Sequence, residues 1–173
     1  VTLISPYPEP GQPSRTGVAW YTQGLARALA AAGAGVTVVA PGRPGAGAEE
    51  ADGPVRVTRC FRRGGAGLVR AARAAEATGA PVTHVQHEAF LYGGPDSVPA
   101  TLMALRRLRG PVVTMHQVVA PGTVDRDFTG MHRVGIPPTV ARAGLATLQA
   151  SISRLASRVI VHEDAFRRVL PGS

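Results

Sequence analysis

Three of the five histidines stand where short, β-branched segments end. His87, which is followed by Glu88, ends one such segment, and His116 and His162 follow two others. The carboxyl ends of parallel strands meet at one edge of a sheet, so these side chains are predicted to converge there. For His162 a hydrogen-bonded capping role at its strand end is favoured, and His132, in an irregular stretch, has no such positional argument.

A second candidate site lies at the predicted start of the first helix. Arg15, Thr16 and Gly17 follow the first apolar segment and a loop rich in proline and glycine. The free N–H groups and the positive dipole end of a helix N-terminus favour a bound phosphate. The residues do not form the G-x-G-x-x-G pattern of dinucleotide-binding domains. A glycine at such a turn can also serve backbone geometry alone, so both interpretations stay open.

Metal and hydrolase chemistry are poorly supported, and no cofactor or metal is predicted. His84 and His87 are three apart on a predicted strand, which places them on opposite faces. No cysteine pair, H-E-x-x-H motif or G-x-S-x-G elbow occurs. Cys60, the only cysteine, cannot form an internal disulfide and is expected to pack inertly within a strand.

The elements that would position these residues form an alternating pattern. Short β-branched runs alternate with Ala/Leu/Arg-rich segments, which is typical of a parallel α/β sheet. The predicted strands are 1–5, 35–40, 55–60 (near a sheet edge), 82–86, 112–115 and 159–161. The predicted helices are 16–32, 67–78, 98–107, 139–155 and 164–170. Residues 41–54 are expected to be a mobile loop, and segment 92–96 (YGGPD) predicts a sharp turn that shapes a pocket rim or simply reverses the chain.

This order predicts a doubly wound, Rossmann-like α/β/α fold with a mostly parallel sheet of about six strands. The 173 residues, 45% of them hydrophobic, suit a single domain with a sizeable core. No run approaches the roughly 18 apolar residues of a membrane-spanning helix. The chain opens inside an apolar run and stops at a turn, so we expect it to be a piece of a longer protein.

The net charge of +8 comes from arginine alone. All 19 basic residues are arginine, a bias that suggests a GC-rich bacterial genome. Aromatic residues are only 5% of the chain and scattered, which argues against nucleic acid as a partner. Six arginines gather around the third predicted strand and its helix, and we expect a solvated face or, alternatively, a contact with an anionic lipid surface. They are Arg56, Arg59, Arg62, Arg63, Arg70 and Arg73.

Four segments, in order along the chain, carry a family resemblance. They are TGVAWYTQGLARALAAAGAGVTVVAP at 16–41, HVQHEAFLYGG at 84–94, PVVTMHQV at 111–118 and RVIVHEDAFRRVL at 158–170. Together they resemble the N-terminal domain of a bacterial GT-B-fold retaining glycosyltransferase of family 4. Thr16 stands where that family usually has the first glycine of a pair.

The resemblance implies two Rossmann-like domains with catalysis in the cleft between them. Residues 1–173 would be the single N-terminal, acceptor-side domain. The C-terminal domain, which binds the nucleoside-diphosphate-sugar, would be absent from this chain. The loop of Arg15, Thr16 and Gly17 would approach the donor diphosphate, and His116 would be the catalytic residue beside the reacting sugar.

On the acceptor side, the resemblance implies that His87, Glu88 and Tyr92 bind the substrate. The predicted reaction passes a sugar to a hydroxyl acceptor such as a lipid or a glycan, with retention and without an obligatory metal. The predicted location is the cytoplasm, with the inner face of the membrane as the alternative. The alternatives are a non-catalytic binding or regulatory module on the same scaffold and a peripheral membrane-surface protein.

Overall fold

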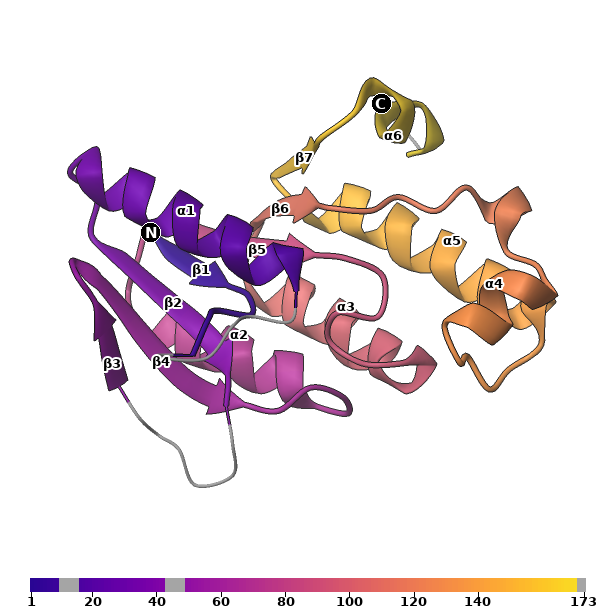
Figure 1. Ribbon diagram of the computed structural model, residues 1–173, viewed down its shortest axis with the longest axis horizontal. Helices are drawn as coiled ribbons and strands as arrows, with labels where there is room; N and C mark the ends of the chain where they lie inside the picture. Colours follow the sequence, from indigo (N-terminus) through magenta and orange to yellow (C-terminus); the bar gives the residue numbers. More distant parts are fainter. Residues whose placement is uncertain (10–15, 43–48, 171–173) are drawn as a thin grey trace.

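A computed structural model describes residues 1–9, 16–42 and 49–170, which form a layered α/β fold (Figure 1). Within this part of the chain the sheet has seven strands in the order β3-β4-β2-β1-β5-β6-β7. The strands are β1 (Thr2–Ile4), β2 (Val36–Pro41), β3 (Glu49–Asp52), β4 (Val55–Phe61), β5 (Thr83–His87), β6 (Val112–Met115) and β7 (Arg158–Val161). All neighbouring pairs are parallel except β3 with β4. The predicted Rossmann-like fold is confirmed.

Helices cover both faces of the sheet. They are α1 (Gly17–Ala31), α2 (Gly67–Ala77), α3 (Val98–Arg107), α4 (Arg126–Met131), α5 (Pro138–Leu155) and α6 (Asp164–Val169), with short 3-10 turns η1 (Pro95–Ser97) and η2 (Pro121–Thr123). Helix α1 lies on one face, whereas α2, α3 and α5 lie on the other (Figure 1). The strand order reverses between β1 and β5, so the crevice at their carboxyl ends is where such a fold binds ligands.

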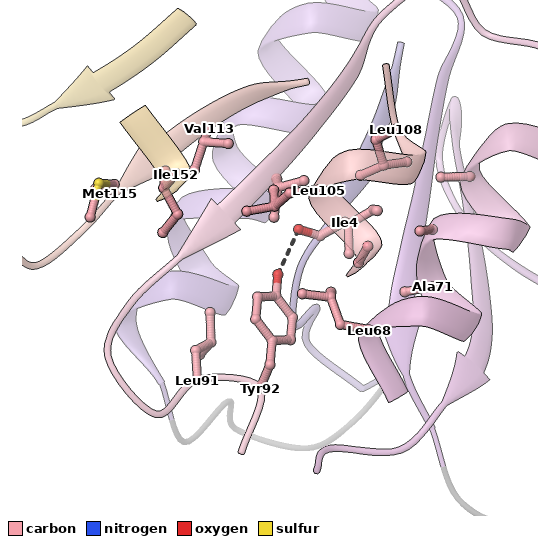
Figure 2. Packing of buried hydrophobic residues seen from close by; sticks show 14 of the residues in the cluster. Ile4, Leu68, Ala71, Leu91, Tyr92, Leu105, Leu108, Val113, Met115 and Ile152 are labelled. Atoms are coloured by element: carbon pink, nitrogen blue, oxygen red, sulfur yellow. Dashed lines mark hydrogen bonds between the residues drawn. The ribbon is translucent and has the colours of Figure 1, made fainter. Parts of the chain in front are cut away.

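The period-2 alternation of the strands divides the core between the two faces. Leu3 and Val38 pack under α1, whereas Ile4, Val85 and Val113 pack against α2, α3 and α5. The larger of these clusters is drawn in Figure 2, which shows Tyr92 reaching into it to donate its hydroxyl hydrogen to the carbonyl of Ile4. Apolar residues of the short strands therefore pack against helices on both faces of the sheet.

Helix α1 has sequence signals at both ends. The side chain of Thr16 caps its first turn by accepting a hydrogen bond from the Ala19 amide at 3.3 Å. The helix ends before Gly33, whose φ of 87° is a conformation that glycine adopts at little cost. The amide of Ala34 then donates to the carbonyl of Leu29, which completes a Schellman-type end. These residues therefore determine where α1 begins and where it ends.

The predicted loop over 41–54 is wrong at residues 49–52. Those residues form β3, an antiparallel edge strand whose Glu50 pairs with Val57 of β4. Residues 43–48 lie outside the described part of the chain. The sequence EEAD has weak strand propensity, and the pairing is supported instead by side chains that are distant in sequence. Strand β4, which was expected near a sheet edge, lies next to the edge strand β3.

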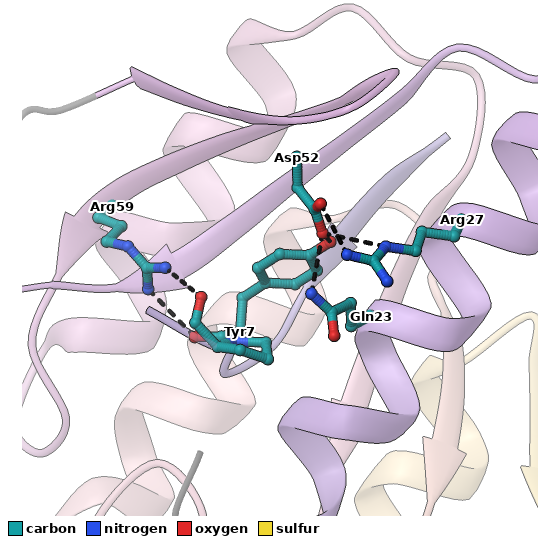
Figure 3. Close-up of polar contacts among 6 residues, drawn as sticks. Tyr7, Gln23, Arg27, Asp52 and Arg59 are labelled. Carbon is teal, nitrogen blue, oxygen red and sulfur yellow. Dashed lines mark hydrogen bonds and ion pairs between the residues drawn. The ribbon is translucent and has the colours of Figure 1, made fainter. Parts of the chain in front are cut away.

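One of the supporting side chains is Arg59, for which the expectation of a solvated arginine is wrong. Arg59 is only 5% exposed and its Nε pairs with the Glu50 carboxylate at 3.0 Å. Its Nη2 donates to the carbonyl of Pro8 at 2.7 Å and its Nη1 to that of Tyr7 at 3.2 Å (Figure 3). One guanidinium thus ties the edge strand to the segment that follows β1.

A second tie joins β3 to α1. The Asp52 carboxylate accepts hydrogen bonds from the Tyr7 hydroxyl at 2.7 Å and from Gln23 Nε2 at 2.9 Å, and it pairs with Arg27 at 2.8 Å (Figure 3). The hydrogen bond from Arg27 is the main reason that the pKa of Asp52 is lowered to about 2. Asp52 is therefore ionised at neutral pH and holds three elements together.

Candidate functional site

Two of the predicted site histidines meet at the switch point, on opposite faces of the sheet. The backbone amide of His116, directly after β6, donates to the backbone carbonyl of His87, the last residue of β5, at 2.8 Å. The His116 side chain lies on the α1 face, with Gln86 and His162, whereas His87 points towards α3 and α5. The edge therefore offers two adjoining sites, one on each face.

On the α1 face, four polar side chains form a continuous hydrogen-bonded chain. Gln86 Nε2 lies 3.3 Å from His84 Nε2, and Gln86 Oε1 lies 2.8 Å from His116 Nε2. His116 Nδ1 in turn lies 3.1 Å from His162 Nε2. The chain runs from the buried middle of β5 to the exposed end of β7, because alternate residues of neighbouring strands share this face.

The hydrogen-bonding pattern assigns the tautomer of His116. An amide nitrogen only donates, so Gln86 Nε2 donates to His84 Nε2 and the Gln86 oxygen accepts. His116 must then donate from Nε2 to the Gln86 oxygen, and in the neutral ring Nδ1 accepts the His162 Nε2 proton. Both nitrogens of the imidazole are therefore engaged.

Electrostatics favour the same protonation state. Burial, followed by the nearby imidazoles of His162 and His84, lowers the pKa of His116 to about 4. Burial also lowers the pKa of His84. At neutral pH the buried members of this hydrogen-bonded series thus carry no charge. His116 can then accept or donate hydrogen bonds without first losing a proton.

Helix α1 brings its first turns close to this group. The ring of Tyr21 contacts the rings of His116 and His162 edge-on, with centroid distances of 4.8 and 5.3 Å. Thr16 and Gly17, predicted for the donor loop, begin the same helix. Arg15, the third predicted residue of that loop, lies outside the described residues.

His87, Glu88 and Tyr92, predicted for the acceptor side, all line one pocket on the other face. This pocket of about 50 Å³ lies between α3, α5 and the segment that follows β5. The Tyr92 hydroxyl is engaged by the carbonyls of Ile4 and Gln86, so its ring rather than its hydroxyl faces the pocket. Burial raises the pKa of Tyr92 and keeps it a phenol.

The unusual member of this pocket is His87. It is 7% exposed, and its Nδ1 has no hydrogen-bond partner within the described residues. Burial, and secondarily the neighbouring His116, lowers the pKa of His87 to about 4, so the ring is neutral at pH 7. A buried polar atom without a partner costs about 1–3 kcal/mol. Because His87 also lines the pocket, this unpaired atom makes the pocket a candidate ligand site.

The predicted sharp turn shapes the rim of this pocket. Gly93 has φ 143°, and a Cβ there would lie 2.8 Å from the Cα of Gly64, so both the backbone and the space call for glycine. Arg63, expected on a solvated face, is exposed and also holds the turn. Its Nε donates to the carbonyl of Leu91 at 2.7 Å and its Nη2 to that of Phe90 at 2.9 Å.

Sequence reasoning missed Gln86 and Tyr21 as members of the site and favoured a capping role for His162. A signal for Gln86 existed, because an amide two residues from His84 in an apolar strand must find partners on the same face. No local signal identifies Tyr21, since its contact depends on where α1 crosses the sheet. The contact of His162 with His116 likewise follows from the register of β6 and β7.

Neither a metal centre nor a membrane-spanning helix is found among the described residues. No group of three or more His, Cys, Asp or Glu side chains there could hold a metal ion. None of the helices described above combines the length and apolar composition needed to cross a membrane.

The doubly wound sheet, with a capped helix and a histidine chain at its carboxyl edge, defines a Rossmann-like domain. The family model described as "Glycosyl transferase 4-like domain" matches residues 16–171, and the chain belongs to that family. A protein named UDP-N-acetylenolpyruvoylglucosamine reductase, from Parvibaculum lavamentivorans, is 32% identical over 123 residues. The match covers 71% of this chain and 36% of the relative. No solved structure matches the chain significantly.

Proposed function

We propose that the chain is the acceptor-side, N-terminal domain of a bacterial GT-B-fold glycosyltransferase. In this proposal a sugar passes from a nucleoside-diphosphate-sugar to a hydroxyl acceptor with retention, and the donor-binding domain lies outside these 173 residues. The observation that carries the proposal is the family match over 16–171, together with the neutral histidine chain at the switch point. The protein would act in the cytoplasm.

The start of α1 would receive the donor diphosphate. Gly17 does not have a positive φ, and a Cβ built on it would meet no atom within 4 Å. Neither backbone strain nor packing therefore demands glycine, and the open surface lets a phosphate approach the N–H groups of Gly17 and Val18. The helix dipole would stabilise the charge of the leaving diphosphate without an obligatory metal.

His116 would position the transferred sugar. Its Nδ1 is an acceptor that His162, an exposed side chain, occupies in this structure. A sugar hydroxyl can replace His162 at this atom, while Gln86 keeps the ring in place through Nε2. The acceptor would approach from the other face, past His87 and Glu88.

Kinetics of the natural full-length protein test this proposal. A panel of nucleotide-sugars is screened for release of nucleoside diphosphate, alone and with hydroxyl acceptors. We expect one donor to be consumed, and His116→Ala to lower kcat/KM for that donor by about 100-fold. His162→Ala should instead lower the donor KM, because it frees His116 Nδ1.

Two results would contradict the proposal. If no donor were consumed with any acceptor by folded protein, a non-catalytic binding or regulatory module would be the better description. If His116→Ala left turnover unchanged, the chain could still be a transferase domain, but His116 would not position the sugar.

A further inference from the structure

The pocket beside His87 opens next to a second hollow. The inner pocket of about 50 Å³ and an outer bay of about 380 Å³ share part of their walls. The shared residues are Phe90, Gly93, Gly94, Pro95 and Val134. The two hollows therefore lie side by side, on either side of the same turn.

The inner pocket is apolar and small. Its walls include Leu91, Val98, Leu145 and Leu148, and one water-sized group needs roughly 10–15 Å³ of such space. A volume of about 50 Å³ thus fits a short alkyl or similarly sized apolar group. His87 is among the polar residues that line this pocket, and its Nδ1 is buried without a partner among the described residues.

The outer bay is basic. Its charged side chains are the two guanidinium groups of Arg63 and Arg133 and the single carboxylate of Asp96, with His132 between them in the wall. Arg133 is exposed and makes no side-chain hydrogen bond or ion pair with any described residue. Its φ of 51° lies in the left-handed region, directly after α4. The excess of positive charge favours an anion in the bay.

We propose that the acceptor is an anionic amphiphile. Its short apolar group would occupy the inner pocket beside His87, and a phosphate or carboxylate joined to it would lie in the outer bay near Arg63 and Arg133. This inference rests on the proposed function, which assigns the pocket to the acceptor. A neutral oligosaccharide would leave both the apolar wall and the free guanidinium unmatched.

Gly144 offers a way to fill the inner pocket without disturbing the fold. It lies in the middle of α5 and lines the pocket, and a Cβ built on it would meet no atom within 4 Å. Gly144→Leu should therefore keep the fold, because its Cβ meets no atom and leucine has the higher helix propensity. Gly24→Leu is the matched control, since Gly24 is equally open, exposed and within α1.

The experiment is a calorimetric titration of the chain with hexyl phosphate, hexanol and inorganic phosphate. We expect hexyl phosphate to bind at least tenfold more tightly than either of the other two. Gly144→Leu should weaken hexyl phosphate by at least tenfold and leave inorganic phosphate unchanged, whereas Gly24→Leu should change neither. Arg133→Asn, in which asparagine tolerates the left-handed backbone, should weaken both phosphates.

Each contrary result overturns a stated part of the inference. Hexyl phosphate binding no more tightly than inorganic phosphate would exclude the amphiphile and leave a phosphate site only. If neither Gly144→Leu nor Arg133→Asn changed the affinity for hexyl phosphate, the binding site would lie elsewhere. Sugar transfer by the full-length protein without hexyl phosphate binding would overturn this inference alone. Binding without any donor consumption would instead overturn the proposed function.

Discussion

Gln86 determines how the ring of His116 is held. It is fully buried, and its amide oxygen and nitrogen are both engaged, by His116 and His84. The neutral amide can present only its oxygen to His116 while its nitrogen donates to His84. The orientation of the His116 ring therefore depends on a residue that would touch neither donor nor acceptor.

We predict that Gln86→Glu raises the pKa of His116. A carboxylate has nearly the shape of the amide, but its negative charge favours the imidazolium form at a distance of about 3 Å. The pKa should rise from about 4 to above the ordinary histidine value of 6.5. Nitrogen and carbon chemical shifts of the His116 ring, followed from pH 3 to 9, measure this. A titration midpoint that stays near 4 would show that Gln86 does not contact His116 in solution.

The sequence predicted part of the residue-scale arrangement. His87, His116 and His162 were placed at the same edge because each ends a recognisable apolar segment. Tyr21 could not be placed in this way, since its ring contacts depend on how α1 crosses β6 and β7. Whether His87 Nδ1 finds a hydrogen-bond partner depends on all the residues around it. No local sequence pattern could therefore predict that it lacks one among the described residues.

At the scale of the element, β3 shows how a strand forms against its own propensity. Its residues would read as loop, yet Glu50 and Asp52 are held by Arg59 and Arg27 from β4 and α1. These partners are between 9 and 25 residues away in sequence. The sequence predicted the strands whose apolar residues form the core and missed the one that polar contacts stabilise.

We predict that Asp52→Asn destabilises the fold by about 1–2 kcal/mol, because three partner side chains lose their charged acceptor. Glu49→Gln, on the same exposed strand, should change the free energy of unfolding by less than about 0.5 kcal/mol. Urea denaturation at pH 7 measures both values. Equal effects of the two substitutions would mean that the charge of the strand, rather than the Asp52 contacts, is what matters.

For the whole molecule, the doubly wound order explains why one edge serves two ligands. Because β1 and β5 lie at the switch point, α1 leaves the edge on one face and the segment after β5 leaves it on the other. The histidine chain thus borders the α1 side, and the apolar pocket borders the α3 and α5 side. His87 and His116 join the two through one backbone hydrogen bond.

Both of these histidines are held neutral, so the stability of the whole fold should depend on pH. Their folded pKa values of about 4 lie below the ordinary 6.5, so between these limits the unfolded chain binds more protons. Stability should therefore be greatest above pH 6.5 and should fall as the pH drops towards 4. For the buried His87, the difference corresponds to about 3 kcal/mol.

Asp52 acts in a different window, which lets the two effects be separated. Its folded pKa of about 2 lies below its ordinary value, so its stabilising contribution is complete above about pH 4 and is lost only below that. Urea denaturation at pH 7.5, 5.5 and 4.5 therefore reports mainly on the histidines. His87→Gln, which cannot take up a proton, should flatten this pH dependence relative to the parent. A parent protein equally stable at all three pH values would mean that His87 and His116 are solvated, and the closed pocket would have to be abandoned.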